Sequence, residues 1–319
     1  MIESDTASAR AALARAKRAD VLFTWAVYGS CAVFFLVVAG IFVQLLNGSN
    51  LALKQFGLSF LWTSQWNPVT SQFGALPLVY GTIVSSLIAI ALAAGIGIFA
   101  AAFLADFAPK LLARPLSFVI ELLAAVPSVV FGLWGLFVLA PLMRNSVDPF
   151  LQKTLGFAPI FQGPIFGTSL LTAGVILAIM IIPTVTAISR DIIDAVPTDL
   201  REGSAALGAT RWETMRKVVL PAARTGIFGA CILALGRALG ETIAVTMVIG
   251  NKPALSTSLF APAYSLPSVI ANEFAEATTD VYLSALIELG LVLFLVSMLV
   301  NGLARVLTWT VLRQAAGGR

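Results

Sequence analysis

The chain has 319 residues, of which 59% are hydrophobic and 11% are charged, and its formal net charge is +4. Soluble domains carry roughly 25% charged residues, so this composition excludes an ordinary soluble protein and predicts an all-α, polytopic membrane protein. Because the sequence has no histidine, and no metal-ligand spacing around its two cysteines, Cys31 and Cys231, Ser–His–Asp catalysis and His-containing metal sites are excluded and no cofactor is expected.

The first expected element is a basic N-terminal segment, residues 1–20, whose Ala-rich part 6–20 predicts a helix on the inner membrane surface. The apolar run that follows, 21–46, is too long for the apolar part of a signal peptide, and no small-residue cleavage pattern follows it. It therefore predicts an uncleaved first membrane span.

Six apolar stretches are each long enough to cross the roughly 30 Å of bilayer hydrocarbon. They predict one transmembrane domain over 21–312, followed by a short cytoplasmic tail, 313–319. The six expected spans are 22–46, 78–105, 115–143, 167–189, 224–250 and 283–311.

Lysine and arginine fall mainly on one side of these spans. If the N-terminus is cytoplasmic, 15 of the 20 lie in inside segments, four lie in outside loops and one, Arg237, lies within a span. Cytoplasmic loops of membrane proteins carry an excess of positive charge. Both termini are therefore predicted to face the cytoplasm, and the loops 47–77, 144–166 and 251–282 to face outward.

The third expected span contains Pro127, with Glu121 near its cytoplasmic end. A proline inside a helix removes one hydrogen bond and favours a kink. A kink is the structural interpretation, and the further hypothesis is that residues 125–131 line a pathway or form part of a gate.

The longest inside connection, 190–224, has the end signals of two short helices. Thr198 is expected to cap the first helix, and Gly208 to end it in the left-handed conformation. Thr210 and Glu213 have the spacing of a capping box for the second helix, which is expected to stop before Pro221. Such a pair predicts a docking element for a cytoplasmic protein; a helical hairpin lying on the membrane without a partner is the structural alternative.

The fifth expected span places Arg237 near its midpoint, where an arginine costs about 2.5–3.5 kcal/mol on insertion scales. Glu241, four residues later on the same face of the expected helix, lies within reach of Arg237, so mutual pairing is one interpretation. Recognition of an oxyanion by Arg237 is the other. Gly236 and Gly240 form a Gly-x-x-x-Gly pair, which favours close approach of another helix. In the sixth span, Glu288 is a further candidate to face the same pathway.

Several motifs resemble those of one protein family. EGSAALG at 202–208, followed after nine residues by VVLP at 218–221, resembles the EAA loop of ABC importer permeases, although Gly203-Ser204 replaces Ala-Ala and Val218 replaces Ile. WNPVTSQFGALPLVYGT at 66–82, ELLAAVPSVVFGLWG at 121–135 and GRALGETIAVTMVIGN at 236–251 resemble the phosphate permeases of the PstC type. The four stretches stand in the same order and cover about 66–251.

The resemblance implies a type I ABC importer permease, and hence the path for inorganic phosphate across a bacterial inner membrane. It implies a homologous second permease, two copies of an ATP-binding cassette subunit and an extracytoplasmic phosphate-binding protein as partners. In that family the EAA loop sits in a groove of the ATPase. The residues implied for ATPase coupling are Glu202, Ala205, Ala206, Leu207, Gly208, Leu220 and Pro221, and those for the substrate pathway are Arg237, Glu241 and Thr242.

The loop 47–77 carries Trp62, Trp66, Asn67 and Pro68, with Phe73 and Pro77 after them. Interfacial tryptophan is commonly a membrane anchor, whereas the resemblance suggests a platform for the substrate-delivering protein. Both interpretations stay open at this point.

Other functions remain as alternatives. A permease for another oxyanion, such as sulfate or molybdate, is the nearest, and a gradient-driven transporter or channel is next. No nucleophile–base pair or metal constellation supports a membrane-embedded enzyme. The chain has no P-loop sequence Gly-x-x-x-x-Gly-Lys-Ser/Thr, so ATP hydrolysis is expected in a partner subunit and none in this chain.

Overall fold

The computed structural model describes residues 2–316, and the side chains of Lys17, 20–109 and 111–306. Within these residues all named secondary-structure elements are helices, and the β-type pairing consists of isolated bridges that form no strand. Six helical stretches are long and apolar enough to cross a membrane, which confirms the predicted number of spans. They are Asp20–Gly48, Leu76–Phe107, Ser128–Leu155, Leu170–Asp194, Arg211–Leu239 and Asp280–Val306.

The spans are built from the following elements. The first belongs to α1 (Ile2–Gly48), the fourth to α8 (Leu170–Asp194) and the sixth to α14 (Asp280–Ala316). Shorter helices, α2 (Asn50–Phe56) and α13 (Leu266–Glu273), lie in the connections. The other three spans contain π-helical turns. The second span is α3 (Leu76–Ala102) followed by the π turn Phe103–Phe107, and the fifth is α10 (Arg211–Thr214), the π turn Met215–Val219 and α11 (Leu220–Leu239). The third span consists of α5 (Ser128–Trp134), α6 (Ala140–Leu142) and α7 (Asp148–Leu155), which are joined by the π turns Gly135–Leu139 and Met143–Val147.

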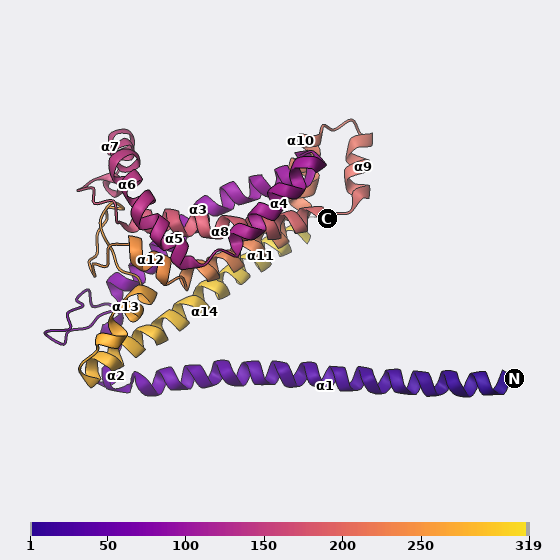
Figure 1. Cartoon of the computed structure of the whole chain (residues 1–319), viewed down its shortest axis with the longest axis horizontal. Coiled ribbons are helices and arrows are strands. Elements are labelled where there is room, and N and C mark those ends of the chain that lie inside the picture. The colour runs from indigo at the N-terminus through magenta and orange to yellow at the C-terminus, as the bar shows by residue number, and fades with distance from the viewer. Residues whose placement is uncertain (1, 317–319) are drawn as a thin grey trace.

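The bundle has two ends, which Figure 1 shows at the right and the left. The right-hand end carries α9 (Thr198–Ala206) and α10 and is called the hairpin end below. The left-hand end carries α2, α7, α13 and the connecting segments 57–75, 156–169 and 249–265, and is called the loop end.

The third span begins later in the chain than predicted. Residues 110–124 form a separate helix, α4 (Lys110–Ala124), and the chain is extended at Pro127 (φ −58°, ψ 139°) before α5 begins. The prediction of one kinked span over 115–143 is therefore wrong. Pro127 ends one helix and precedes another because it cannot donate the hydrogen bond that would continue the first.

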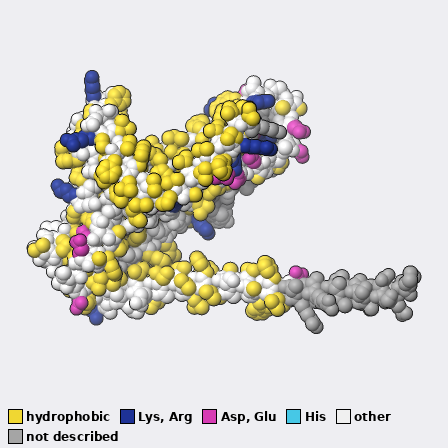
Figure 2. All heavy atoms as spheres, viewed as in Figure 1, with side chains coloured by type: hydrophobic (Ala, Val, Ile, Leu, Met, Phe, Trp, Pro, Cys, Tyr) yellow, Lys and Arg dark blue, Asp and Glu magenta, His cyan; other side chains and the backbone are white. Residues whose placement is uncertain are grey.

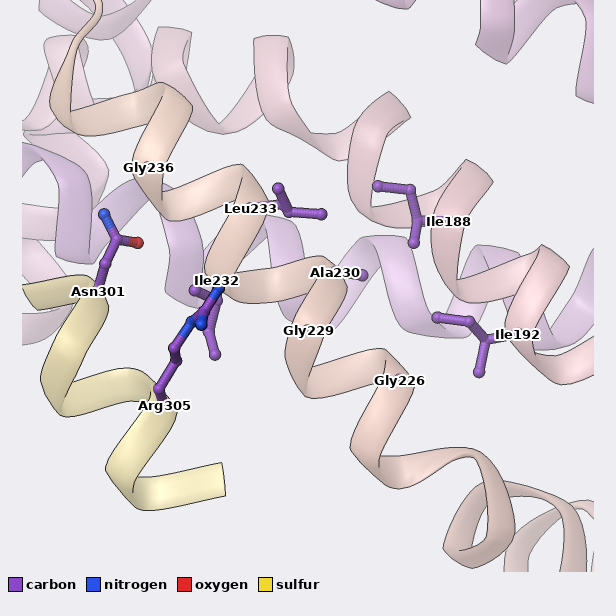
Figure 3. A pocket seen from close by; sticks show the side chains of 10 residues that line it. All are labelled: Ile188, Ile192, Gly226, Gly229, Ala230, Ile232, Leu233, Gly236, Asn301 and Arg305. Atoms are coloured by element: carbon purple, nitrogen blue, oxygen red, sulfur yellow. The ribbon is translucent and has the colours of Figure 1, made fainter. Parts of the chain in front are cut away.

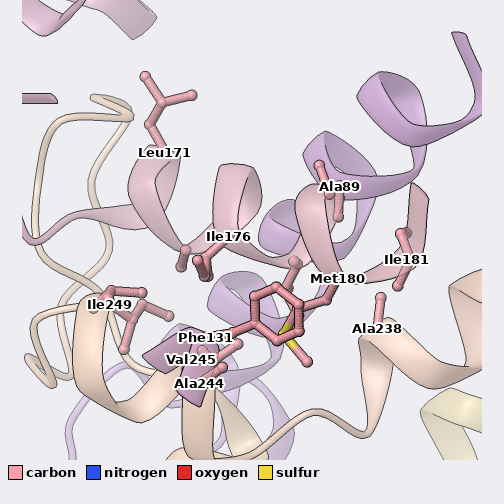
Figure 4. Close-up of a cluster of buried hydrophobic side chains, with 14 of the residues drawn as sticks. Ala89, Phe131, Leu171, Ile176, Met180, Ile181, Ala238, Ala244, Val245 and Ile249 are labelled. Carbon is pink, nitrogen blue, oxygen red and sulfur yellow. The ribbon is translucent and has the colours of Figure 1, made fainter. Parts of the chain in front are cut away.

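The centre of the bundle is the packing of α3 on α8, which small residues allow. An added Cβ at Gly174 of α8 would lie 2.5 Å from the Ile88 Cγ2 of α3, and one at Gly97 would lie 2.9 Å from the Val185 Cγ1. Small residues let membrane helices approach closely. Figure 4 shows the Phe131 ring of α5 inserted beside this pair, among buried side chains of α8 and of α12 (Ile243–Val248).

A second buried cluster closes the loop end. One Glu273 oxygen accepts hydrogen bonds from the Trp66 indole (2.8 Å) and from the Tyr282 hydroxyl (2.6 Å), and the Phe73 ring stacks on Tyr282 with centroids 5.2 Å apart. Trp66 is therefore a buried structural residue, whereas Trp62 is 75% exposed. Burial also raises the pKa of the neighbouring Tyr264 hydroxyl above its ordinary value.

The first span stands apart from the others. Figure 1 shows α1 meeting α14 near the loop end and diverging from it toward the hairpin end. The contacts are close at that meeting point, where the Phe42 and Phe294 rings lie 5.5 Å apart and Gly48 faces Ile287. In the most apolar 18-residue stretch of Asp20–Gly48, no residue is buried against the rest of the described chain.

Candidate functional site

The predicted fifth span, 224–250, is not one continuous helix. α11 ends at Leu239, residues 240–242 are non-helical, and α12 begins at Ile243. A break in a membrane helix frees carbonyl groups on one side and N–H groups on the other, and it is tolerated where it is buried in protein or lines a wet cavity. Discontinuous helices of this kind form substrate sites in many transporters.

Arg237 lies in the last turn of α11, where a cation complements the negative end of the helix dipole. Its Nη1 donates to the Thr184 hydroxyl of α8 at 3.3 Å, and no carboxylate of the described side chains forms an ion pair with it. The side chain is exposed on the surface of the single chain. Most of the guanidinium donors are thus available to a ligand.

Glu241 and Thr242 occupy the break itself. The Glu241 carboxylate accepts from the Ala244 N–H of α12 at 3.3 Å, and the Thr242 hydroxyl donates to the Gly240 carbonyl at 3.3 Å. The acid therefore stabilises the start of α12 as Arg237 stabilises the end of α11. Both side chains are half-buried.

The pairing of Arg237 with Glu241, one of the two interpretations, is not formed in the structure. The chain leaves the helix at Gly240, so the two residues do not stack one turn apart. The expected close approach of another helix at Gly236 and Gly240 is also absent within the described chain. A Cβ added at Gly236 would meet only the Asn301 side chain, 3.6 Å away, and one at Gly240 would meet only its own helix.

A groove runs along α11 beside this break, and Figure 3 shows it bounded by α8, α11 and α14. Its volume is about 1040 Å³. Along α11 its floor is formed largely by small residues, and Arg305 of α14 extends its side chain toward Ile232. The groove lining is Ile188, Ile192, Gly226, Gly229, Ala230, Ile232, Leu233, Gly236, Asn301 and Arg305.

The second candidate site is the helical hairpin formed by α9 and α10. Gly208 has φ +84° and ends the first helix, and Thr210 and Glu213 form the complete capping box, both as predicted. Thr198 is instead the first residue of α9 and makes no capping bond, because Pro197 occupies the N-cap.

The second helix of the hairpin does not stop before Pro221, and that prediction is wrong. α10 continues through the π turn Met215–Val219 into α11, with Pro221 in the first turn of α11. A π turn widens the helix and accommodates the proline ring and its missing N–H. One continuous helix, Arg211–Leu239, therefore joins the hairpin to Arg237.

Polar contacts fasten the hairpin to the bundle. The Arg201 guanidinium forms an ion pair with Asp106 at the end of the second span, and its Nη2 also donates to the Ile193 carbonyl of α8 at 2.6 Å. Within the hairpin, the Ser204 and Thr214 hydroxyls lie 3.0 Å apart. These contacts fix α9 relative to α3 and α8.

The hairpin exposes the residues expected to couple to an ATPase. Leu207 is 90% exposed, and Gly208 has open space around the position of a Cβ. Leu220 and Pro221 lie apart from this face, at the start of α11. The predicted coupling residues exposed together on α9 and the turn after it are Glu202, Ala205, Ala206, Leu207 and Gly208.

Sequence reasoning missed the residues that position these two sites. Thr184 follows Pro183 within the fourth expected span, and Asp106 lies at the end of the second span. Each is a single polar residue in or beside an apolar stretch. Nothing in the sequence indicates that Thr184 contacts Arg237, 53 residues later, or that Asp106 contacts Arg201, 95 residues later.

Comparison with known proteins agrees with the resemblance seen in the motifs. A family model described as binding-protein-dependent transport system inner membrane component matches residues 93–311. Phosphate transport system permease protein PstC of Mesorhizobium japonicum is 47% identical over 290 residues, which cover 90% of this chain and 89% of that protein. Probable phosphate transport system permease protein PstC of Methanocaldococcus jannaschii is 40% identical over 256 residues, covering 78% and 81%.

A solved structure shares the fold. It is a bacterial ABC transporter involved in the import of the acidic polysaccharide alginate, and the likeness covers 90% of this chain and 97% of that chain with a TM-score of 0.56. The sequences are 16% identical, so this likeness bears on the fold alone.

Proposed function

Because the chain belongs to the binding-protein-dependent transport system inner membrane components, and within them to the phosphate permeases of the PstC type, we propose that residues 237–242 form its part of the phosphate path. The chain is the permease subunit of an ATP-driven phosphate importer. Like its relatives it is a transport subunit, and we place ATP hydrolysis in a partner.

The break between α11 and α12 is the observation that carries this proposal. It places Arg237, Glu241 and Thr242 where the helix backbone is open, next to spans that are mainly apolar. Arg237 has one weak hydrogen bond, to Thr184, and no ion pair within the described side chains. A cation that is held in position but not neutralised is suited to bind an anion that must later leave.

The roles of the three residues follow from their chemistry. The planar Arg237 guanidinium donates two parallel hydrogen bonds to phosphate oxygens. Thr242 offers a hydroxyl beside it. The Glu241 carboxylate repels the anion and limits its affinity, and it also accepts a hydrogen bond from the protonated oxygen of hydrogen phosphate, which sulfate lacks.

The hairpin at the other end of α11 is proposed to transmit ATP hydrolysis to this site. Glu202, Ala205, Ala206, Leu207 and Gly208 would contact the ATPase, because they form its exposed surface. Movement of the hairpin would pass through Leu220 and Pro221 along the continuous helix Arg211–Leu239 to Arg237.

The proposed assembly contains a second, homologous permease, two copies of the ATP-binding cassette subunit and an extracytoplasmic phosphate-binding protein. The excess of lysine and arginine at the hairpin end supports an orientation with this end and both termini in the cytoplasm. The loop end then faces outward, and the chain spans a bacterial inner membrane.

Phosphate uptake tests the site. Arg237→Gln is expected to lower uptake at least tenfold, because a hydrogen bond to a charged group contributes about 1.5–3 kcal/mol. Arg237→Lys keeps the charge without the planar fork and should retain intermediate uptake. Copurification of the ATPase shows whether each variant assembles. Normal uptake by the double variant Arg237→Gln/Glu241→Gln would contradict the proposal.

A further inference from the structure

A polar pocket lies at the loop end of the third span, distant in sequence from the residues of the proposed path. Its volume is about 260 Å³. The third span supplies one wall and the segment before α8 supplies the other. The lining is Leu136, Ala140, Pro141, Arg144, Asn145, Phe166 and Thr168.

Three of the lining side chains carry hydrogen-bond donors that are free. The side chains of Arg144, Asn145 and Thr168 form no hydrogen bond or ion pair with any described part of the chain. Together they offer a guanidinium, an amide and a hydroxyl, and no acidic side chain lines the pocket. This donor set matches the acceptors of a tetrahedral oxyanion.

The local helix geometry keeps Arg144 unpaired. In an α-helix Asp148 would lie one turn from Arg144 and pair with it. The intervening turn, Met143–Val147, is π-helical, so residues four apart no longer stack. Asp148 instead faces the core, with no exposed surface, and Arg144 keeps its full charge at the pocket.

The wall opposite Arg144 depends on a glycine. Gly167 has φ +89°, and a Cβ there would lie 2.7 Å from the Ala140 carbonyl and 3.0 Å from the Arg144 Cβ. The absence of a side chain lets the segment approach the third span, and this approach brings Thr168 to the pocket.

One short helix, α12, separates the pocket from the residues of the proposed phosphate path. The Ser169 N–H donates to the Val248 carbonyl at 3.0 Å, so the wall that carries Thr168 lies against the last residue of α12. The other end of α12 follows Glu241 and Thr242, and six helical residues span only about 9 Å. Figure 2 shows Lys and Arg side chains projecting at the loop end of the molecule on the left.

We propose that Arg144, Asn145 and Thr168 form an outer anion site, which holds a tetrahedral oxyanion before it reaches Arg237. The inference rests on the proposed function, because it assigns a first station on the same path. The ligand class is inorganic phosphate and other tetrahedral oxyanions, and the site would load from the outward-facing side.

A thiol-protection experiment on the assembled importer tests the site. Cys31→Ala and Cys231→Ala remove the two native thiols, and Phe166→Cys places a reporter on the rim. An uncharged maleimide modifies this cysteine, with the phosphate-binding protein omitted. Inorganic phosphate is expected to slow the modification several-fold, whereas chloride at the same ionic strength does not.

Two substitutions localise the effect. Arg144→Gln should raise the half-protecting phosphate concentration at least tenfold. Lys153→Gln, which removes an exposed charge of α7 outside the pocket lining, should leave it within twofold. Leu136→Cys serves as a second reporter on the same pocket if Phe166→Cys does not assemble.

The inference is overturned if phosphate gives no protection, if Arg144→Gln is protected as well as its parent, or if only the added binding protein protects the reporter. The last outcome would make this pocket a protein contact. Failure of the proposed path is a separate result, because normal uptake by Arg237→Gln would remove the role of Arg237 and leave the protection at Phe166→Cys unchanged.

Discussion

Gly174 of α8 lies so close to Ile88 of α3 that an added Cβ would overlap the isoleucine at both Cγ2 (2.5 Å) and Cβ (2.7 Å). Because Ile88 is branched at Cβ, its side chain has little freedom to move away. Gly95 lies in the same span as Ile88 and has no neighbouring atom within 4 Å of a Cβ. Two glycines in membrane helices therefore have different structural roles.

Gly174→Ala is expected to destabilise the permease by about 1–3 kcal/mol, as overpacking does in other cores. The midpoint of thermal unfolding of the purified complex should fall. Gly95→Ala is the matched control and should leave the midpoint unchanged. Equal midpoints for the two variants would contradict the close packing of α3 on α8.

The charges at the break show what one sequence can predict. Arg237 and Glu241 stand out because each is costly in an apolar stretch, and this cost, together with the resemblance of the GRALGET motif, marked them as functional candidates. Their mutual geometry was not predictable, because it depends on where α11 ends. Gly240 permits that end but does not require it, and Thr184, which holds Arg237, comes from another span.

At the scale of elements, the α9–α10 hairpin combines a preformed turn with a fixed attachment. Gly208 adopts φ +84°, which suits glycine, whereas Gly203 in the same hairpin has no positive φ. Neither has an atom within 4 Å of a Cβ. The backbone conformation is thus the main difference between the two positions.

Gly208→Ala should therefore strain the turn by about 1–2 kcal/mol and reduce both phosphate uptake and copurification of the ATPase. Gly203→Ala should retain both, since an alanine fits the helical backbone there. If the two variants behave alike, the left-handed turn is not needed for docking.

The ion pair of Arg201 with Asp106 carries a different prediction. Arg201→Gln removes the attachment to the end of the second span and leaves the exposed face of α9 unchanged. ATPase copurification should persist while uptake falls roughly tenfold, because α9 is no longer fixed to the end of the second span and passes less of its movement to the bundle. Lys217→Gln, which removes an exposed pair with Glu213, is the control and should have little effect. Normal uptake by Arg201→Gln would argue against the attachment.

Sequence signals predicted the hairpin and the number of spans correctly because they rest on local rules. Hydropathy, the Thr210–Glu213 capping box and the glycine at 208 each act within a few residues. The same rules failed at Pro127 and Pro221. Pro127 separates two helices, whereas a π turn carries the chain through Pro221, and this difference depends on neighbouring spans that a local pattern does not contain.

At the scale of the whole molecule, the unequal distribution of charge makes a topology prediction. Cys31→Ala and Cys231→Ala remove the native thiols for this test. In that variant, Val69→Cys should react with an impermeant maleimide in intact cells, because residue 69 is at the loop end and is 92% exposed. Leu207→Cys at the hairpin should react only after the membrane is permeabilised. The reverse pattern would invert the proposed orientation.

The separation of α1 from the bundle affects how stability should be measured. A helix whose described residues touch the rest of their chain only near one end adds stability mainly when another surface covers the remainder, and such coverage follows mass action. The free energy of unfolding of this protein is then a function of subunit concentration, so dilution of the complex should lower its apparent melting temperature. In the cell, the lifetime of each copy would follow the supply of its partners.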